Sequence, residues 1–186
     1  MQLAIKIDFD DTYDIDSISE DLTHFQFTTI TKEGQSVILG IEIETNKNQF
    51  LPSVFNLGFG PFKEDGTLDD KAVINHQNNS KVYSTILLGA LTFLRSNPDK
   101  FVGLDGSDMI RAYLYYRVFQ RNYEYLVQYF RVIGVKYYVR LIRSPENNQE
   151  LVSDNQDIAV FPHPIARGEN IRCEKLYNYF TLNLPR

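Results

Sequence analysis

The chain has 186 residues and a mass of 21.6 kDa, and 43% of its residues are hydrophobic, which suits one globular domain with a sizeable core. Its single cysteine, Cys173, excludes an internal disulfide framework and any multi-cysteine zinc or iron–sulfur centre. No run approaches the roughly 18 to 20 consecutive apolar residues of a membrane span, and the opening residues are acidic where a secretory signal is basic. We therefore expect a cytoplasmic protein without a membrane partner, with a single domain over residues 1–186.

Charge is distributed unevenly along the chain. Residues 1–110 contain 17 acidic and 8 basic residues, whereas residues 111–143 contain 7 basic residues and one acidic residue, within a net charge of −5. Ten aromatic residues are interleaved with the bases of the second region. The opening 23 residues show the reverse, with seven acids against Lys6 alone. Two interpretations follow: the two regions pair inside the fold, or they attract a partner.

The first half of the chain predicts mainly β-structure. Alternating or apolar runs indicate strands at residues 3–7, 25–31, 36–45 and 50–59. The second and third of these strands are separated by Lys32-Glu33-Gly34-Gln35, which predicts a hairpin. Asp65-Gly66 is a tight-turn signal, so we expect residues 58–74 to form a second hairpin.

The helical period begins near residue 79. Apolar residues at spacings of three and four predict a helix at about 79–96, with Asn79 or Ser80 as its N-cap. Residues 101–104 indicate a short buried strand. The spacing of apolar residues then predicts a second helix at about 108–121, capped by Ser107 or Asp108.

The remaining residues predict one more strand pair and a tail. Residues 135–141 alternate between apolar and polar, which indicates a half-exposed strand that pairs with residues 129–133 across Gly134. We expect residues 144–157 to form a flexible loop and residues 158–186 a C-terminal extension. The predicted fold class is α+β, with a mainly antiparallel sheet and the helices at about 79–96 and 108–121 packed on one face.

Two segments carry a resemblance to a known family. They are Phe55-Asn56-Leu57-Gly58-Phe59-Gly60 with residues 68–75 (LDDKAVIN), and Gly106-Ser107 followed by Arg111, Leu114 and Tyr115. Over about residues 50–120 the chain resembles an uncharacterised bacterial family in which YNLGFGD, IDDxxVSNNGD, a helix and GSTPARTRLYR occur in this order. Asp108-Met109-Ile110 replace Thr-Pro-Ala, and Tyr113 and Tyr116 replace the second and third arginines. The resemblance implies no activity, but it implies a toxin–antitoxin or phage-defence locus.

The start of the second helix has two interpretations. Gly106-Ser107 leads into a helix whose first turn contains Arg111, and unpaired helix N–H groups with a guanidinium can hold a phosphate. Asp105 and Asp108 lie at the same helix start, where they repel an anion and offer partners to Arg111. The alternative is therefore a helix cap with a local ion pair.

The basic aromatic region predicts a nucleic-acid surface, because arginines neutralise phosphates and tyrosines stack on unpaired bases. The candidate nucleic-acid or phosphate contacts are Gly106, Ser107, Arg111, Tyr113, Arg117, Arg121, Lys136, Tyr138 and Arg140. A structural role is the alternative, in which the aromatic residues fill the core and the bases answer the acidic opening segment. A protein partner with an acidic surface is a third interpretation.

Other site chemistries have little support in the sequence. The cluster Asp8, Asp10 and Asp11, or Asp69-Asp70, offers oxygen ligands to a divalent ion, but without the spacing of a calcium loop. Solvated carboxylates and turn chemistry explain both clusters better. The three histidines accompany no nucleophile, and neither a dinucleotide nor a Walker motif occurs. We expect no metal, no cofactor and no catalytic residue.

The expected function is a non-catalytic binding protein of toxin–antitoxin or phage-defence type that engages RNA or DNA through an Arg/Tyr-rich face. One alternative is a protein-interaction or homo-oligomerisation module that uses the sheet edge and residues 144–186. Another is an enzyme on a nucleotide or phosphorylated substrate, in which Ser107 and Arg111 position the phosphate and Asp69 or Asp70 acts as a base.

Overall fold

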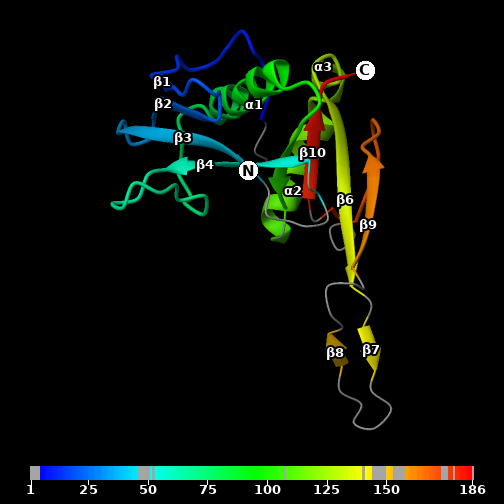
Figure 1. The fold of residues 1–186 in the computed structure, drawn as a ribbon. Coiled ribbons are helices and arrows are strands. Elements are labelled where there is room, and N and C mark those ends of the chain that lie inside the picture. The colour runs from blue at the N-terminus through cyan, green and yellow to red at the C-terminus, as the bar shows by residue number, and fades with distance from the viewer. Residues whose placement is uncertain are drawn as a thin grey trace.

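The computed structural model describes residues 5–45, 51, 53–106, 108–139, 141–143, 150–152, 158–172, 176–177 and 179–185. An eight-stranded sheet has the order β1-β2-β3-β4-β5-β10-β6-β9, in which β4 and β5 are parallel and the other neighbours antiparallel. The strands are β1 (Ser17–Ile18), β2 (His24–Ile30), β3 (Ser36–Thr45), β4 (Val54–Pro61), β5 (Phe101–Asp105), β6 (Arg131–Val139), β9 (Ile158–Pro164) and β10 (Tyr179–Asn183). In Figure 1, β3 and β4 run across the view whereas β6 and β10 run nearly upright, so the sheet twists strongly.

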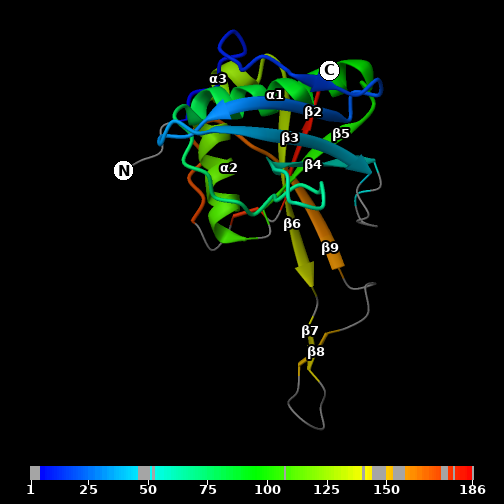
Figure 2. The ribbon, with the colours of Figure 1, turned by 90° about the vertical axis from the view of Figure 1, so that its left-hand side faces the viewer.

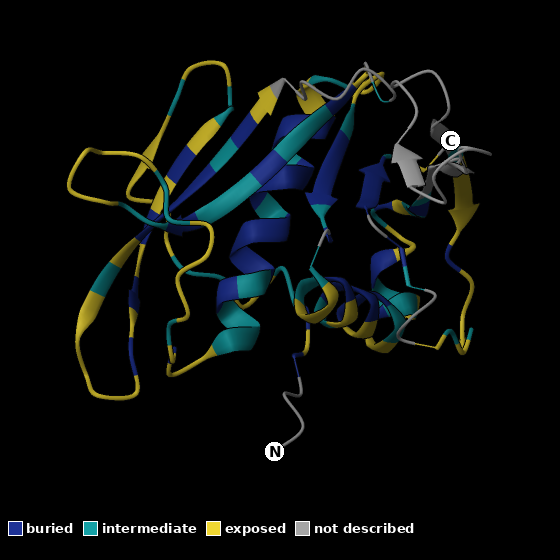
Figure 3. Ribbon diagram, turned by 90° about the horizontal axis from the view of Figure 1, so that it is seen from below, coloured by how far each residue is buried: buried dark blue, intermediate teal, exposed yellow. Residues whose placement is uncertain are grey.

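Helices α1 (Asn79–Ser96) and α2 (Met109–Arg121) cover one face of the sheet, and a short helix α3 (Tyr123–Leu126) follows α2. The main core lies between these layers, where Ile41 and Phe180 of the sheet meet Ile86 of α1 and Phe119 of α2. The view in Figure 2 shows the helices beside the strands, and Figure 3 shows where buried residues concentrate. The predicted α+β fold, with two principal helices on one face, is confirmed. None of the described helices is long and apolar enough to cross a membrane.

The β2–β3 hairpin follows from its alternating sequence. Along β2, odd-numbered residues are buried and even-numbered residues exposed, as expected for a strand with one face on the core. Phe25 pairs with Ile41 and Phe27 with Leu39, which places these apolar side chains on the helix-covered face. Gly34 has φ +81° in the connecting turn, a conformation that favours glycine.

Helix caps define where α1 and α2 begin. The side chain of Asn78, one residue before the predicted cap, accepts the backbone N–H of Lys81 at 3.0 Å. Asp108 caps α2 by accepting the N–H groups of Ile110 and Arg111, both at 2.9 Å. The two helices therefore have the predicted bounds within a residue or two, because their start and stop signals are local.

One predicted strand and one predicted hairpin of the first half are wrong. Residues 5–7 of the predicted strand 3–7 are not paired in the sheet, and residues 3 and 4 lie outside the described residues. The predicted second hairpin is reduced to a single bridge between Phe62 and Leu68 around the Asp65-Gly66 turn, and residues 69–74 form no strand. Gly66 has φ +83°, so the turn itself forms as predicted.

The predicted hairpin across Gly134 is also wrong, since residues 131–139 form the single strand β6. Its neighbours come from the last part of the chain: β9 pairs along one side of β6, and β10 pairs along the other side. Residues 158–186, which we expected to be an extension, thus contribute β10 between β5 and β6. Strands β7 (Leu141–Arg143) and β8 (Glu150–Val152) form a separate two-stranded sheet beyond β6 and β9, so part of the expected loop 144–157 is strand (Figure 1).

Candidate functional site

Helix α2 distributes the predicted contacts over two of its sides. Arg117 and Arg121 are one turn apart, and Tyr113 lies one turn before Arg117, so these three side chains share one stripe of the helix. Arg111 lies outside this stripe, because six residues separate it from Arg117 and rotate it far around the axis. Helix α2 therefore offers a continuous surface to Tyr113, Arg117 and Arg121, whereas Arg111, which we expected on the same face, lies apart from them.

Arg111 is held by two carboxylates. Its Nε donates a hydrogen bond to Oδ2 of Asp108, and its Nη1 lies 3.5 Å from Oδ2 of Asp70. The hydrogen bond from Arg111 lowers the pKa of Asp108, and Asp108 in turn raises the pKa of Arg111. The helix start thus has the cap and local ion pair of the structural interpretation. An incoming phosphate at Arg111 must compete with both carboxylates.

The segments that carry the family resemblance meet around Arg111. The 69–70 loop packs against β4 at Gly60, where a Cβ atom would lie 2.2 Å from the carbonyl oxygen of Asp69. The ion pair to Asp70 then joins this loop to α2. Gly106 is buried at the entry to α2, where a Cβ atom would lie 3.2 Å from Cα of Ala112. Glycine is needed at residue 60 for this close approach of the chain, and at residue 106 a Cβ atom would require its neighbours to shift slightly.

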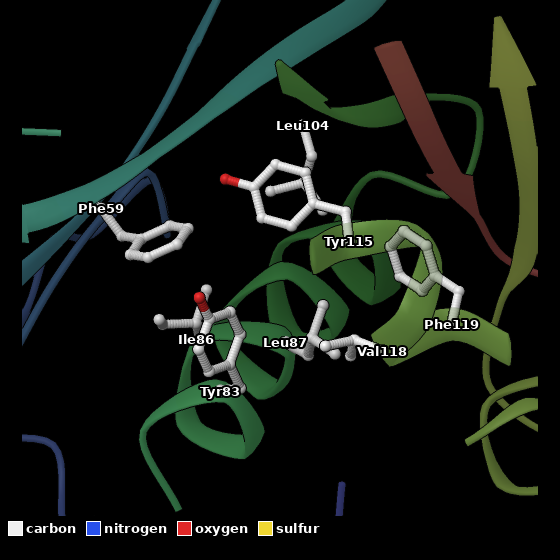
Figure 4. Close-up of a pocket in the computed structure, with 8 residues that line it drawn as sticks. All are labelled: Phe59, Tyr83, Ile86, Leu87, Leu104, Tyr115, Val118 and Phe119. Atoms are coloured by element: carbon white, nitrogen blue, oxygen red, sulfur yellow. The ribbon is translucent and has the colours of Figure 1, made fainter. Parts of the chain in front are cut away.

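A pocket lies beside this cluster, between α1, α2 and the sheet. It is small, with a volume of about 10 Å³, and its lining residues are Phe59, Tyr83, Ile86, Leu87, Leu104, Tyr115, Val118 and Phe119. Figure 4 shows the hydroxyl groups of Tyr83 and Tyr115 on the side of the pocket nearest Phe59. Burial raises the pKa of Tyr83 to about 12 and also raises that of Tyr115, so both hydroxyls stay protonated at neutral pH.

The outer stripe of α2 has a different character. Tyr113 is 46% exposed, and Arg117 and Arg121 are exposed. Within the described part of the chain, neither arginine forms an ion pair. Two positive charges and one aromatic ring, those of Arg117, Arg121 and Tyr113, therefore face solvent along about two turns of helix, which we call the α2 stripe.

Lys136 lies next to α2 but is partly enclosed. Its Nζ lies 5.2 Å from the ring centroid of Tyr177, and that ring lies 6.5 Å from the ring of Tyr116 on α2. Glu169 closes the group, because its carbonyl oxygen accepts the hydroxyl of Tyr116 and its Oε1 lies 3.2 Å from Nε2 of His163. Lys136 is therefore half-buried, with its ammonium over this ring cluster.

The other predicted contacts fall where the structure says less. Ser107 and Arg140 lie outside the described residues. The backbone of Tyr138 lies in β6, but its side chain is outside the described part of the structure. Cys173 also lies outside the described residues.

The acidic opening segment makes its own contacts. Asp8 pairs with Lys6 at 3.6 Å and Asp11 with Lys81 at 3.5 Å. Among the described residues, no ion pair joins residues 8–21 to residues 111–143. No group of three or more His, Cys, Asp or Glu side chains within the described ranges is arranged to hold a metal ion.

Sequence reasoning missed two parts of this region. Tyr83 and Tyr115 lie on different helices, and no local signal in the sequence brings them together at one pocket. Asp70 was assigned to turn chemistry or a base, and its contact with Arg111 spans 41 residues. The shared occurrence of both segments in the family pattern was the available signal.

Comparison with known proteins identifies the family. The chain belongs to a family of unknown function, DUF6934, whose sequence model matches residues 10–152. This confirms the resemblance to an uncharacterised family of unknown function. None of the curated proteins matches the chain significantly, and neither does any solved structure.

Proposed function

We propose that this member of the DUF6934 family is a non-catalytic binding protein that engages single-stranded RNA or DNA through the α2 stripe. The observation that carries the proposal is the pair of exposed arginines, Arg117 and Arg121, one turn apart and in line with the exposed ring of Tyr113. Guanidinium groups neutralise phosphates, and an exposed tyrosine ring offers a stacking surface for an unpaired base.

The environment of each residue supports this choice among the nine predicted contacts. Arg117 and Arg121 carry no carboxylate partner among the described residues, so binding a phosphate breaks no internal ion pair. Arg111 is left out because Asp108 and Asp70 already occupy its guanidinium. Lys136 is a secondary contact, since reaching a phosphate draws its ammonium away from the ring of Tyr177.

The experiment is fluorescence anisotropy with a labelled single-stranded oligonucleotide, titrated at several salt concentrations. For single strands, the slope of log K against log salt is about −0.7 per neutralised phosphate, so Arg117→Gln with Arg121→Gln reduces the slope by about 1.4. Tyr113→Ala weakens binding by about 1 to 3 kcal/mol through lost stacking. Arg95→Gln is the matched control, because Arg95 is an exposed arginine near the end of α1.

Two results would contradict the proposal. One is the absence of association with any polyanion at low salt. The other is equal binding by the wild type and the Arg117→Gln, Arg121→Gln double variant, because then the positive charge of α2 is not the contact. A toxin–antitoxin or phage-defence role rests on the family resemblance, and co-purification with the product of an adjacent gene tests it.

A second candidate, a protein-interaction module, is favoured by apolar residues at the start of α2. Ile110 is 82% exposed and Met109 64% exposed, and both precede the α2 stripe on the same helix. Apolar groups that stay in solvent favour a protein contact. Sizing experiments separate the two functions: a stable oligomer or complex that resists salt, lacks nucleic acid and is broken by Ile110→Glu supports the interaction module.

A further inference from the structure

Residues 5–9 lie along helices α1 and α3 and are held by side chains of the helices rather than by a strand. The backbone N–H groups of Lys6 and Asp8 donate to the hydroxyls of Ser80 and Ser84 on α1, each at 2.9 Å. The intervening N–H groups donate to the other wall: that of Ile7 to Oδ1 of Asn122 at 2.8 Å, and that of Phe9 to the hydroxyl of Tyr125 at 2.8 Å. Four consecutive N–H groups thus meet four side-chain acceptors.

The spacing of the helix side chains matches the spacing of alternate residues in the segment. Alternate residues of an extended chain repeat about every 6.6 Å, and residues one turn apart on a helix repeat about every 6 Å. Ser80 and Ser84 are one turn apart on α1, so they can follow residues 6 and 8 in step. Asn122, at the end of α2, also donates from Nδ2 to the carbonyl oxygen of Ile5 at 3.1 Å. We call the surface formed by Ser80, Ser84, Asn122 and Tyr125 the groove, and its side chains bind the backbone of an extended chain.

Side chains provide the apolar half of the recognition. Ile5 is 2% exposed and Ile7 is 1% exposed, whereas the side chain of Lys6 between them is 78% exposed. Phe9 continues the apolar side, with its ring 4.9 Å from that of Tyr129. Burial alternates over residues 5–7 with the period of two of an extended peptide, and Phe9 is half-buried, so the groove takes apolar side chains at residues 5, 7 and 9.

The groove has a polar lining that needs an occupant. Ser84 is 1% exposed and Asn122 is 7% exposed, and both use their side chains on residues 5–8. Without an extended chain these groups lose partners they are placed to hold. The occupant is joined to the rest of the fold by a turn, in which the N–H of Asp10 donates to Oδ1 of Asp8 at 3.1 Å. This turn is the covalent link between the groove and its occupant, whose Ile5 and Ile7 side chains are buried in the main core.

We propose that this groove is a peptide-binding site of the pattern Ile-x-Ile-x-Phe, filled by the chain's own residues 5–9 and able to take the same segment from a second copy. Every copy carries both the groove and the segment, so the contacts made within one chain and between two chains are the same. The choice between them depends on the turn at residues 9–11 and on protein concentration. The site is independent of the α2 stripe.

The first experiment measures capture of a fluorescein-labelled synthetic peptide of residues 3–11 by the full chain. In the wild type the resident segment competes, so capture is weak. In the chain carrying Ile7→Ser the resident segment is weakened, and the apparent affinity for the peptide rises about tenfold or more, with a higher Tm on peptide addition. A peptide carrying the same Ile7→Ser change is the control and does not bind. A folded Ile7→Ser chain that ignores the wild-type peptide overturns the proposal.

Two further measurements keep the test decisive if Ile7→Ser does not fold. Amide hydrogen exchange on the wild type is expected to be faster at residues 6–9 than in β2 and β3, and equal protection overturns the proposal because the segment then never leaves. Asp10→Pro removes the turn's N–H donor and favours an extended Phe9, so it shifts the chain to a dimer in light scattering. A monomeric Asp10→Pro chain excludes the second copy.

Discussion

Asn122→Ala tests whether side-chain hydrogen bonds hold the opening segment in place. The Asn122 amide accepts from the N–H of Ile7 at 2.8 Å, and donates to the carbonyl oxygens of Ile5 at 3.1 Å and Val118 at 2.8 Å. Alanine removes all three hydrogen bonds and leaves one N–H and one C=O of the segment without partners. A buried unsatisfied group costs about 1 to 3 kcal/mol, so we expect a loss of about 3 kcal/mol in the free energy of unfolding.

Urea unfolding followed by circular dichroism and by tyrosine fluorescence measures this loss, since the chain has twelve tyrosines and no tryptophan. For a domain of this size, about 3 kcal/mol corresponds to a decrease in Tm of about 6 to 12 °C. Gln128→Ala is the control: its exposed side chain also bonds a carbonyl, that of Glu124, at 3.0 Å, and its loss changes stability by no more than about 0.5 kcal/mol. A change below about 1 kcal/mol for Asn122→Ala refutes the reasoning.

Three further changes have definite outcomes. Gly60→Ala places a Cβ against the carbonyl oxygen of Asp69 and is expected to cost about 1 to 3 kcal/mol in urea unfolding, whereas Gly58→Ala, with no atom within 4 Å of its Cβ, leaves the strand packing intact. Asn78→Ala removes the α1 cap and lowers stability by about 1 kcal/mol, and Asn78→Ser retains most of it. Burial lowers the pKa of His76 below 6.5 in the folded chain. As the pH falls below 6.5, the unfolded chain therefore binds the proton first, and the free energy of unfolding decreases until the folded-state pKa is passed. His76→Gln removes this dependence in unfolding measured across that range.

Local signals were sufficient for the elements whose partners are near in sequence. Helix α1 and helix α2 follow from apolar spacing and from capping residues at their starts, although the α1 cap is Asn78 and not the predicted Asn79 or Ser80. Strands β2 and β3 follow from alternation on either side of a turn at Gly34. The family segments around Gly60 and Arg111 were also recognisable, although their meeting in space was not.

Tertiary structure decided which distant residues provide the hydrogen-bond and ion-pair partners of each segment. The alternation at residues 5–7 correctly indicates an extended chain, but its hydrogen bonds go to helix side chains 74 to 117 residues away rather than to a strand. Gly134 could serve a turn, yet it lies inside β6, where it pairs with Phe180 of β10. From the sequence, Arg111 could contact either a phosphate or a carboxylate, and in the fold the 69–70 loop places the carboxylate of Asp70 beside it. Period and caps are properties of neighbouring residues, whereas pairing depends on which distant surfaces the closed fold brings into contact.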